Sequence, residues 1–292
     1  MNTQLATKAL HAGHDSANSQ GTQAVPIYQT TSYVFKDSEH AANLFSLAEP
    51  GFIYTRLNNP TNDVLEQRLA ALEGGVAAVA TASGTAAIAT TLMVILKNGD
   101  HIVASSSLYG GTYNLLANTL PRFGITTTFV DPDSPEEFSK AVQPNTRAFF
   151  AESLGNPKLD VLDLKVISEK AQAAKVPFIV DNTVASPALL NPIEYGANIV
   201  IHSLTKYLTG NGTSLGGIII DAGTFNWANG LFPEFTEPNP SYHGLNYHEA
   251  LGAIAFIAKV RIEGLRDLGS APSPFNSFQT IQGIETLDIR MK

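Results

Sequence analysis

Two apolar runs that end in polar residues decide the fold: Phe178-Ile-Val-Asp-Asn-Thr183 and Ile199-Val-Ile-His-Ser-Leu-Thr-Lys206. Short runs that are apolar throughout are typical of strands buried on both faces of a parallel sheet. Further runs of this kind complete a set of expected strands at residues 76–81, 101–104, 126–130, 148–151, 178–180, 199–202 and 217–220. Between most of them lie patterns with helical spacing, at residues 85–96, 112–123, 135–142 and 164–174. We therefore predict an α/β fold with a mainly parallel sheet covered by helices.

The sequence on either side of this alternation is organised differently. Residues 1–61 are polar and lack sustained periodicity, and we interpret them as an extended N-terminal arm that the aromatic and β-branched residues at 26–35 keep ordered. The α/β domain is expected over residues 62–248, opening with a helix at 63–72 that Gly74-Gly75 ends. Residues 249–292 are expected to contain one long linking helix at 249–268, a further helix at 275–282 and the start of a C-terminal domain.

The composition restricts the function classes. The 292 residues include 18 Lys and Arg against 26 Asp and Glu, so the net charge is −8. An acidic chain without a basic run is a poor binder of nucleic acid and of anionic membranes. The chain contains no cysteine, which excludes disulfides, thiolate catalysis and cysteine-type zinc sites.

No targeting, membrane or metal signal is apparent either. The first residues do not form a signal peptide, and the apolar stretch at 86–96 is too short to cross a bilayer. His11 and His14 have no carboxylate at metal-ligand spacing. We therefore expect a cytoplasmic protein with no metal, no nucleic-acid partner and no membrane partner.

The first candidate site follows the first expected strand. Ligands of open α/β sheets bind outside the carboxyl ends of the strands, so residues at these ends are the ones to consider. Ser83-Gly84-Thr85 follows a strand and opens a helix. Glycine permits close approach of a ligand to the backbone, and the helix N-terminus offers free N–H groups, which makes this turn a candidate phosphate site. The alternative is that Ser83 is simply a helix N-cap.

Two ionisable residues follow other strands. Asp181 ends an apolar strand, where a carboxylate is costly unless it has a cationic partner; the alternative is a local cap or turn. Lys206 follows Ser203 and Thr205 at a strand end, where partial burial would lower its pKa as an imine-forming lysine requires; the alternative is a solvent-facing lysine. A phosphate anchor, a carboxylate for a ring nitrogen and such a lysine are together what pyridoxal phosphate needs.

Several motifs extend this pattern across the chain. They are Pro26-Ile-Tyr-Gln-Thr-Thr-Ser32, Tyr54-Thr-Arg-Leu-Asn-Asn-Pro-Thr61, Leu72-Glu-Gly-Gly75, Ser107-Leu-Tyr-Gly-Gly-Thr-Tyr113, Glu152 to Asn156-Pro157, Val180-Asp-Asn-Thr183 and His202-Ser-Leu-Thr-Lys-Tyr207. With these motifs the chain, from about Lys8 onward, resembles the Cys/Met-metabolism family of pyridoxal-phosphate enzymes, which have the aspartate-aminotransferase-like fold (fold type I). Within the family, segments 34–44, 232–238 and 241–244 are most similar to the O-acetylhomoserine sulfhydrylases.

The resemblance implies a role for each candidate residue. Lys206 would form the imine with pyridoxal phosphate and then move protons between substrate carbons, and Asp181 would keep the pyridine nitrogen protonated. Tyr109 would stack on the ring and assist proton transfer, Asn156 would contact the cofactor's phenolic oxygen or the substrate, and Glu152 would be structural. The phosphate would be held by Ser83, Gly84, Thr85, Ser203 and Thr205 and, from a neighbouring subunit, by Tyr54 and Arg56.

The implied reaction is γ-replacement in sulfur amino-acid biosynthesis: O-acetylhomoserine and sulfide give homocysteine and acetate. The shared motifs leave open a γ-lyase, a cystathionine γ-synthase, or a chain that binds the cofactor but is inactive. The implied partners are an amino-acid ester, sulfide or a thiol, and further copies of the chain in a dimer of dimers. Family chains continue past the motif at 282–287 into a C-terminal domain, so we expect that domain to be only begun at Lys292, without the arginine that binds the substrate carboxylate.

Overall fold

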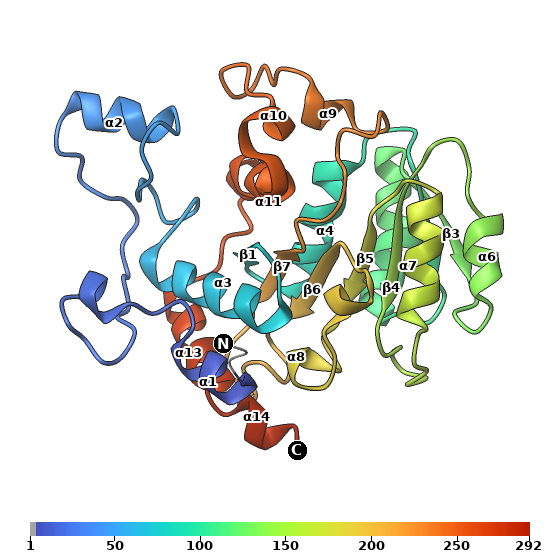
Figure 1. Ribbon diagram of the computed structural model, residues 1–292, viewed down its shortest axis with the longest axis horizontal. Helices are drawn as coiled ribbons and strands as arrows, with labels where there is room; N and C mark the ends of the chain where they lie inside the picture. The colour runs from blue at the N-terminus through green and yellow to red at the C-terminus, as the bar shows by residue number, and fades with distance from the viewer. Residues whose placement is uncertain (1–3) are drawn as a thin grey trace.

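The computed structural model describes residues 4–292 and contains a seven-stranded sheet with helices on both sides (Figure 1). All the predicted strands are present, with bounds within two residues of those expected. They are β1 (Ala77–Thr81), β2 (His101–Ser105), β3 (Thr126–Val130), β4 (Thr146–Glu152), β5 (Phe178–Asp181), β6 (Ile199–Ser203) and β7 (Gly217–Asp221).

The sheet is parallel except at β7. Its strand order is β1-β7-β6-β5-β4-β2-β3, and β7 runs antiparallel to both β1 and β6. The connection from Ser203 to Gly217 contains turns but no helix, and a parallel neighbour usually needs a helical crossover. The prediction of a mainly parallel sheet is therefore confirmed, while the direction of β7 depends on a connection that the apolar pattern does not describe.

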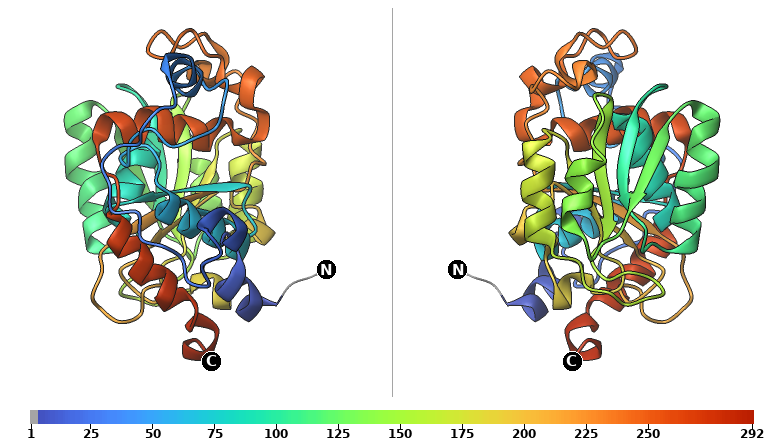
Figure 2. Two further views of the ribbon diagram at one scale, coloured as in Figure 1. Left: turned by 90° about the vertical axis from the view of Figure 1, so that its left-hand side faces the viewer. Right: turned by 90° about the vertical axis from the view of Figure 1, so that its right-hand side faces the viewer.

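Helices cover both faces of the sheet (Figure 2), and the side chains of each strand alternate between these two faces. Val180 of β5 and Val200 of β6 pack in one core cluster with residues of α3 (Pro60–Glu73), α7 (Leu164–Ala173) and α13 (Pro274–Ile284). Ile179 and Ile201 point the other way, into a cluster with α4 (Gly84–Ile95) and α11 (Ala255–Lys259). Neighbouring residues at a strand end therefore face different surroundings.

The remaining helical segments span at most eight residues each. They are α1 (Leu5–His11), η1 (Ser16–Ser19), α2 (Ser38–Phe45), α5 (Gly110–Asn114), η2 (Leu115–Thr119), η3 (Leu120–Phe123), α6 (Pro135–Lys140), α8 (Ser186–Leu189), η4 (Pro192–Tyr195), α9 (Pro233–Thr236), α10 (Tyr247–Leu251), η5 (Gly252–Ile254), η6 (Val260–Leu265), α12 (Arg266–Leu268) and α14 (Leu287–Arg290). Helix α4 has no charged residue because it lies between the sheet and η6, so apolar contacts surround it.

One long helix over residues 249–268 was predicted, and that prediction is wrong. Helix α10 ends at Gly252, whose φ of 53° and ψ of −121° are incompatible with a continuing α-helix and accessible to glycine. Helical structure resumes as η5, α11, the π-helical η6 and α12. The helix predicted at 275–282 is confirmed as α13, which begins with Pro274 in the favoured first position.

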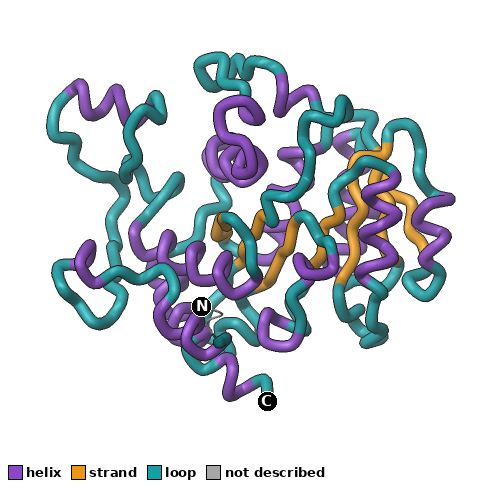
Figure 3. Tube along the Cα trace, in the orientation of Figure 1, coloured by secondary structure: helices purple, strands orange, loops and turns teal. Residues whose placement is uncertain are grey.

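The N-terminal arm is only partly extended. Helix α1 packs on α3 and α14, and the segment that carries α2 projects away from the sheet (Figures 1 and 3). A single bridge pairs Ser32 with Tyr54, and the backbone there has no longer strand. The short helices α1 and α2 were not expected, since each spans at most two turns and leaves little periodicity to detect.

Over residues 4–292, the structure contains no helix both long and apolar enough for a membrane crossing. The same residues contain no group of three or more His, Asp or Glu side chains placed to hold a metal ion.

Candidate active site

A cleft of about 240 Å³ opens at the carboxyl ends of the central strands. We call it the strand-end cleft. It gathers predicted residues from four strand ends and from the loops after β2 and β4. Those that line it are Ser83, Gly84, Thr85, Tyr109, Glu152, Asn156, Asp181, Ser203, Thr205 and Lys206. Its position outside the carboxyl ends of the strands is the one expected for a ligand site in an α/β sheet.

The N-terminus of α4 forms one wall of the cleft. Ser83 caps the helix by accepting a hydrogen bond from the Ala86 N–H through Oγ, at 3.1 Å. The first N–H groups of a helix have no acceptor inside the helix and carry its positive dipole end. A Cβ at Gly84 would lie 2.7 Å from the Ser203 Cβ, so glycine is what lets this helix end meet β6. The turn is thus an N-cap and also an anion-binding geometry.

Asp181 forms the acidic part of the cleft. Its Oδ1 accepts hydrogen bonds from the Thr183 N–H at 3.0 Å and the Thr183 hydroxyl at 2.5 Å. Burial raises the pKa of Asp181, and these two hydrogen bonds partly oppose that rise. Within residues 4–292 no lysine or arginine forms an ion pair with this carboxylate. A bound cation, such as a protonated ring nitrogen, would supply the missing partner.

Lys206 lies in the turn that follows β6, and its side chain is exposed in the cleft. The sequence predicted partial burial of this lysine, and that prediction is wrong, because Lys206 is exposed. The turn is held from both sides, because the Lys206 N–H donates to the Ser203 carbonyl and its carbonyl accepts from Gly210 N–H, at 3.4 and 2.8 Å. The backbone at Lys206 is therefore fixed by hydrogen bonds, while the amine at the end of its side chain remains accessible.

Glu152, at the end of β4, joins two loops of the cleft. Its Oε1 accepts the Tyr109 N–H at 2.6 Å, and its carboxylate also accepts a backbone hydrogen bond from Asn156. Burial, together with the nearby charge of Asp181, raises the pKa of Glu152 to about 8. A carboxyl group bonded to the Tyr109 backbone can hold the loop that carries Tyr109, and the structural role of Glu152 stays a prediction.

Tyr54 and Arg56 lie away from the strand-end cleft. They line a separate groove with Thr30, Ser273 and neighbouring residues. The Arg56 guanidinium lies 5.5 Å from the Tyr54 ring centre and donates a hydrogen bond to the Arg266 carbonyl. In a single chain these two residues therefore do not join the other predicted site residues.

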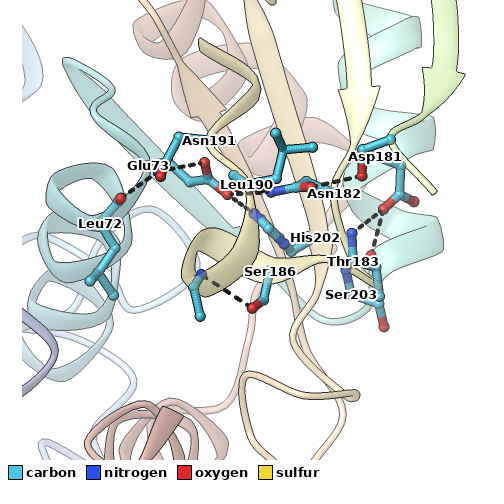
Figure 4. A network of polar contacts seen from close by, with 12 residues as sticks. Leu72, Glu73, Asp181, Asn182, Thr183, Ser186, Leu190, Asn191, His202 and Ser203 are labelled. Carbon is cyan, nitrogen blue, oxygen red and sulfur yellow. Dashed lines mark hydrogen bonds and ion pairs between the residues drawn. The ribbon is translucent and has the colours of Figure 1, made fainter. Parts of the chain in front are cut away.

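Thr183 is one of the cleft residues for which the sequence predicted no role. Besides its bonds to Asp181, its Oγ1 accepts the Ser203 N–H at 2.8 Å, which ties β5 to β6. The sequence feature that could have identified it is its position in the motif Val180-Asp-Asn-Thr183, two residues after Asp181. A close view shows this bond together with a buried network on the other side of the same strand ends (Figure 4).

The fold and the cleft are those of the fold type I class of pyridoxal-phosphate-dependent enzymes. The model of the family "Cys/Met metabolism PLP-dependent enzyme" matches residues 6–292. The chain belongs to this family.

Relatives of known name agree with this membership. The chain is 60% identical to an O-acetyl-L-homoserine sulfhydrylase of Leptospira meyeri, covering 98% of this chain and 66% of that one. It is 50% identical to a homocysteine synthase of Schizosaccharomyces pombe, covering 98% and 67%. The chain thus spans about two thirds of the length of these relatives.

A solved structure gives the same picture. The crystal structure of a proposed O-acetylhomoserine (thiol)-lyase from Campylobacter jejuni superposes with a TM-score of 0.95 at 42% identity, covering 99% of this chain and 72% of that one. That protein carries a pyridoxyl-lysine phosphate residue. The family resemblance and the fold type predicted from the sequence are confirmed.

Proposed function

We propose that the strand-end cleft binds pyridoxal phosphate, with Lys206 as the residue that bonds covalently to the cofactor aldehyde. The observation that carries this proposal is the meeting of Lys206, Asp181 and the α4 N-terminus in one cleft, although they come from three different elements. Asp181 would pair with the ring nitrogen, and the burial of its carboxylate without a lysine or arginine partner among the described residues supports that role. Few ligands other than this cofactor require an amine, a carboxylate and a phosphate cradle together.

The other cleft residues would bind the ring and the phosphate. The exposed Tyr109 ring would stack on the cofactor, and Asn156 would contact its phenolic oxygen or the substrate. Hydroxyl groups and helix N–H groups are suited to a phosphate dianion, since each donates a hydrogen bond to anionic oxygen. The residues proposed for this purpose are Ser83, Gly84, Thr85, Ser203 and Thr205.

Tyr54 and Arg56 would reach the phosphate of a neighbouring subunit. Their groove is separate from the cleft of their own chain, which supports a role in trans. A guanidinium fork suits a phosphate dianion because it donates two parallel hydrogen bonds. This role requires a homo-oligomer, and we propose a dimer of dimers.

The proposed reaction is γ-replacement: sulfide takes the place of acetate on O-acetyl-L-homoserine, giving L-homocysteine and acetate. When bound, the cofactor supplies an electron sink for the carbanions that form next to the amino group. The Lys206 amine would take the proton from one substrate carbon and return it to another, and the Tyr109 hydroxyl would assist. The names of the relatives support this reaction, which belongs to methionine and sulfur amino-acid biosynthesis.

We propose the same domain division as the sequence suggested: an arm at residues 1–61 that contacts a neighbouring subunit, a cofactor domain at 62–248, and a linking segment with the start of a C-terminal domain at 249–292. The projecting position of α2 supports an intersubunit role for the arm (Figure 1). We also propose that the enzyme works in the cytoplasm on small-molecule substrates.

Replacement of Lys206 tests the cofactor assignment. Protein incubated with pyridoxal phosphate should show a visible absorption band that borohydride changes irreversibly, and Lys206→Ala should lose the borohydride-sensitive bond. Turnover should fall by at least about 10³-fold, as expected when a general acid–base is removed. Lys165→Ala, an exposed lysine of α7, should leave both readouts unchanged. A persistent borohydride-stable adduct in Lys206→Ala would reject the assignment.

Product analysis separates the reactions. With O-acetylhomoserine and sulfide, homocysteine should accumulate in equal amount to acetate. Release of 2-oxobutyrate and ammonia without sulfide would identify a γ-lyase. Formation of cystathionine and acetate from O-acetylhomoserine and cysteine, without sulfide, would identify a cystathionine γ-synthase. A visible band with no product under any condition would identify a cofactor-binding but inactive chain.

A further inference from the structure

Three strand ends each present one residue to the cleft and its neighbour to α3. Glu152, Asp181 and Ser203 line the cleft. Ser153, Asn182 and His202 are the respective neighbours, and all three are buried. Because successive side chains of a strand point to opposite faces, the two sets lie back to back on the same backbone. Whatever fixes the buried set also fixes the spacing of the cleft set.

The buried set converges on one carboxylate, that of Glu73 (Figure 4). Glu73 Oε1 accepts hydrogen bonds from Asn182 Nδ2 at 3.0 Å and from His202 Nε2 at 2.6 Å. Its Oε2 accepts a bond from Asn191 Nδ2 at 3.2 Å. Asn182 extends the network to β4, since its Oδ1 accepts the Ser153 hydroxyl at 2.7 Å. Glu73 therefore connects the ends of β5 and β6 directly and the end of β4 through Asn182.

Glu73 lies where a carboxylate destabilises the helix that carries it. It is the last residue of α3, where the helix dipole is negative and a cation would be preferred. The side chains of Glu73 and His202 are both fully buried, and a buried carboxylate is costly unless several donors compensate it. His202 Nδ1 has no hydrogen-bond partner within residues 4–292, so the hydrogen bond between His202 and Glu73 is made through Nε2. Three donors thus compensate the carboxylate, and one of them, Asn191, also donates to the Leu72 carbonyl of α3 at 2.7 Å.

We propose that Glu73 is a positioning residue: its buried carboxylate holds the ends of β4, β5 and β6 at the spacing with which Asp181 and Ser203 receive the cofactor and Glu152 supports Tyr109. This inference rests on the proposed cofactor site. Loss of the carboxylate leaves Asn182 and His202 with unpaired donors in a dry interior, and these side chains then reorient together with their strand ends. The effect is expected first at the cofactor, because Asp181 and Ser203 are the immediate neighbours of the released residues.

The experiment compares Glu73→Gln and Glu73→Ala with Arg68→Ala in the full chain. Arg68 is a matched control because it is a fully buried charged residue of the same helix, yet it bonds to the Ala12 carbonyl and Glu285. Three quantities are measured: the pyridoxal phosphate dissociation constant, the pH midpoint of the bound cofactor's visible band, and the thermal midpoint of cofactor-free protein.

Glu73→Ala should weaken cofactor binding at least tenfold and shift the pH midpoint, and Glu73→Gln should do so less, because it keeps one acceptor oxygen. Arg68→Ala should lower the thermal midpoint but leave the dissociation constant within twofold of the unmodified chain. Should Glu73→Ala fail to fold, Glu73→Gln still decides the matter.

Unchanged cofactor binding and pH midpoint in the Glu73 variants would overturn the role, as would losses that Arg68→Ala reproduces at equal thermal destabilisation. If the unmodified chain bound no pyridoxal phosphate at all, the proposed cofactor itself would be rejected, and this role with it.

Discussion

The two sides of the strand ends differ in how their polar groups are satisfied. On the α3 side, Glu73 accepts hydrogen bonds from three side chains, and water has no access. On the cleft side, Asp181 and Glu152 have raised pKa values, and the amine of Lys206 is exposed. A carboxylate that accepts several buried donors makes a rigid support, whereas the acidic groups of the cleft are ones that a ligand with complementary charges can pair.

The largest effects are expected when the acid and the amide at positions 181 and 182 are exchanged in two single variants, because these neighbours face opposite sides of the strand end. Asn182→Asp replaces a donor to Glu73 with a second buried carboxylate, so we expect the free energy of unfolding to fall by about 3–5 kcal/mol. Asp181→Asn keeps an oxygen acceptor for both Thr183 donors and removes a buried acid, so folding should be nearly unaffected. Turnover should instead fall on the order of 10²-fold, because the proposed partner of the ring nitrogen loses its charge.

Chemical denaturation and steady-state assays of the two variants measure these effects. Equal free energies of unfolding for the two variants would show that a second carboxylate on the α3 side is no more destabilising than the loss of one on the cleft side. Full activity of Asp181→Asn would remove the proposed role of that carboxylate.

The pH dependence of stability sharpens the comparison. The folded-state pKa of Glu152 is about 8, above its ordinary value, so the stabilisation from its protonated form is complete at low pH. It is lost as pH rises through 8, and between about pH 5 and 8 the free energy of unfolding should fall with a slope of up to about 1.4 kcal/mol per pH unit. Glu152→Gln should flatten this part of the curve in cofactor-free protein.

Asp221 provides the control for this measurement. It is buried in β7 outside the cleft, and burial raises its pKa to about 7. Asp221→Asn should flatten the same curve below pH 7 but leave cofactor affinity unchanged. An unaltered slope in Glu152→Gln would mean that Glu152 is ionised in the folded chain at neutral pH.

The smallest expected effect concerns one hydroxyl group. Ser203→Ala removes a proposed phosphate donor while His202, its neighbour on the α3 side, keeps its contact with Glu73. The cofactor dissociation constant should rise several-fold, which corresponds to about 0.5–1.5 kcal/mol for one hydrogen bond. Titration with pyridoxal phosphate measures it, and the thermal midpoint of cofactor-free protein should stay constant. An unchanged dissociation constant would exclude Ser203 from the phosphate site.

Much of the cleft could be predicted because its chemistry is tied to local pattern. Apolar runs located the strands, and the residues after them, such as Asp181 and Lys206, had to lie at one edge of a parallel sheet. The Ser83 turn was predictable for the same reason, since a cap and a glycine mark a helix start. These features depend on a few consecutive residues.

The contact between Glu73 and His202 could not be predicted in this way. The two residues are 129 positions apart, and each is unremarkable in its own segment. The exposure of Lys206 likewise depends on how separate strands meet. So do the two hydrogen bonds of the Thr183 hydroxyl, which donates to Asp181 and accepts from the Ser203 N–H. The spacing of residues along the chain does not give the distance in space between elements that are brought together only by tertiary packing.

The sequence by itself determined the α/β alternation, the candidate residues at the strand ends and, through its motifs, the family. Periodicity and side-chain chemistry are local, so these conclusions needed no coordinates. Tertiary structure alone decided the antiparallel direction of β7, the break at Gly252, the separation of Arg56 from its own cleft and the convergence of three strand ends on Glu73. Each of these depends on the closing of long loops and on side-chain packing, which are properties of the assembled core.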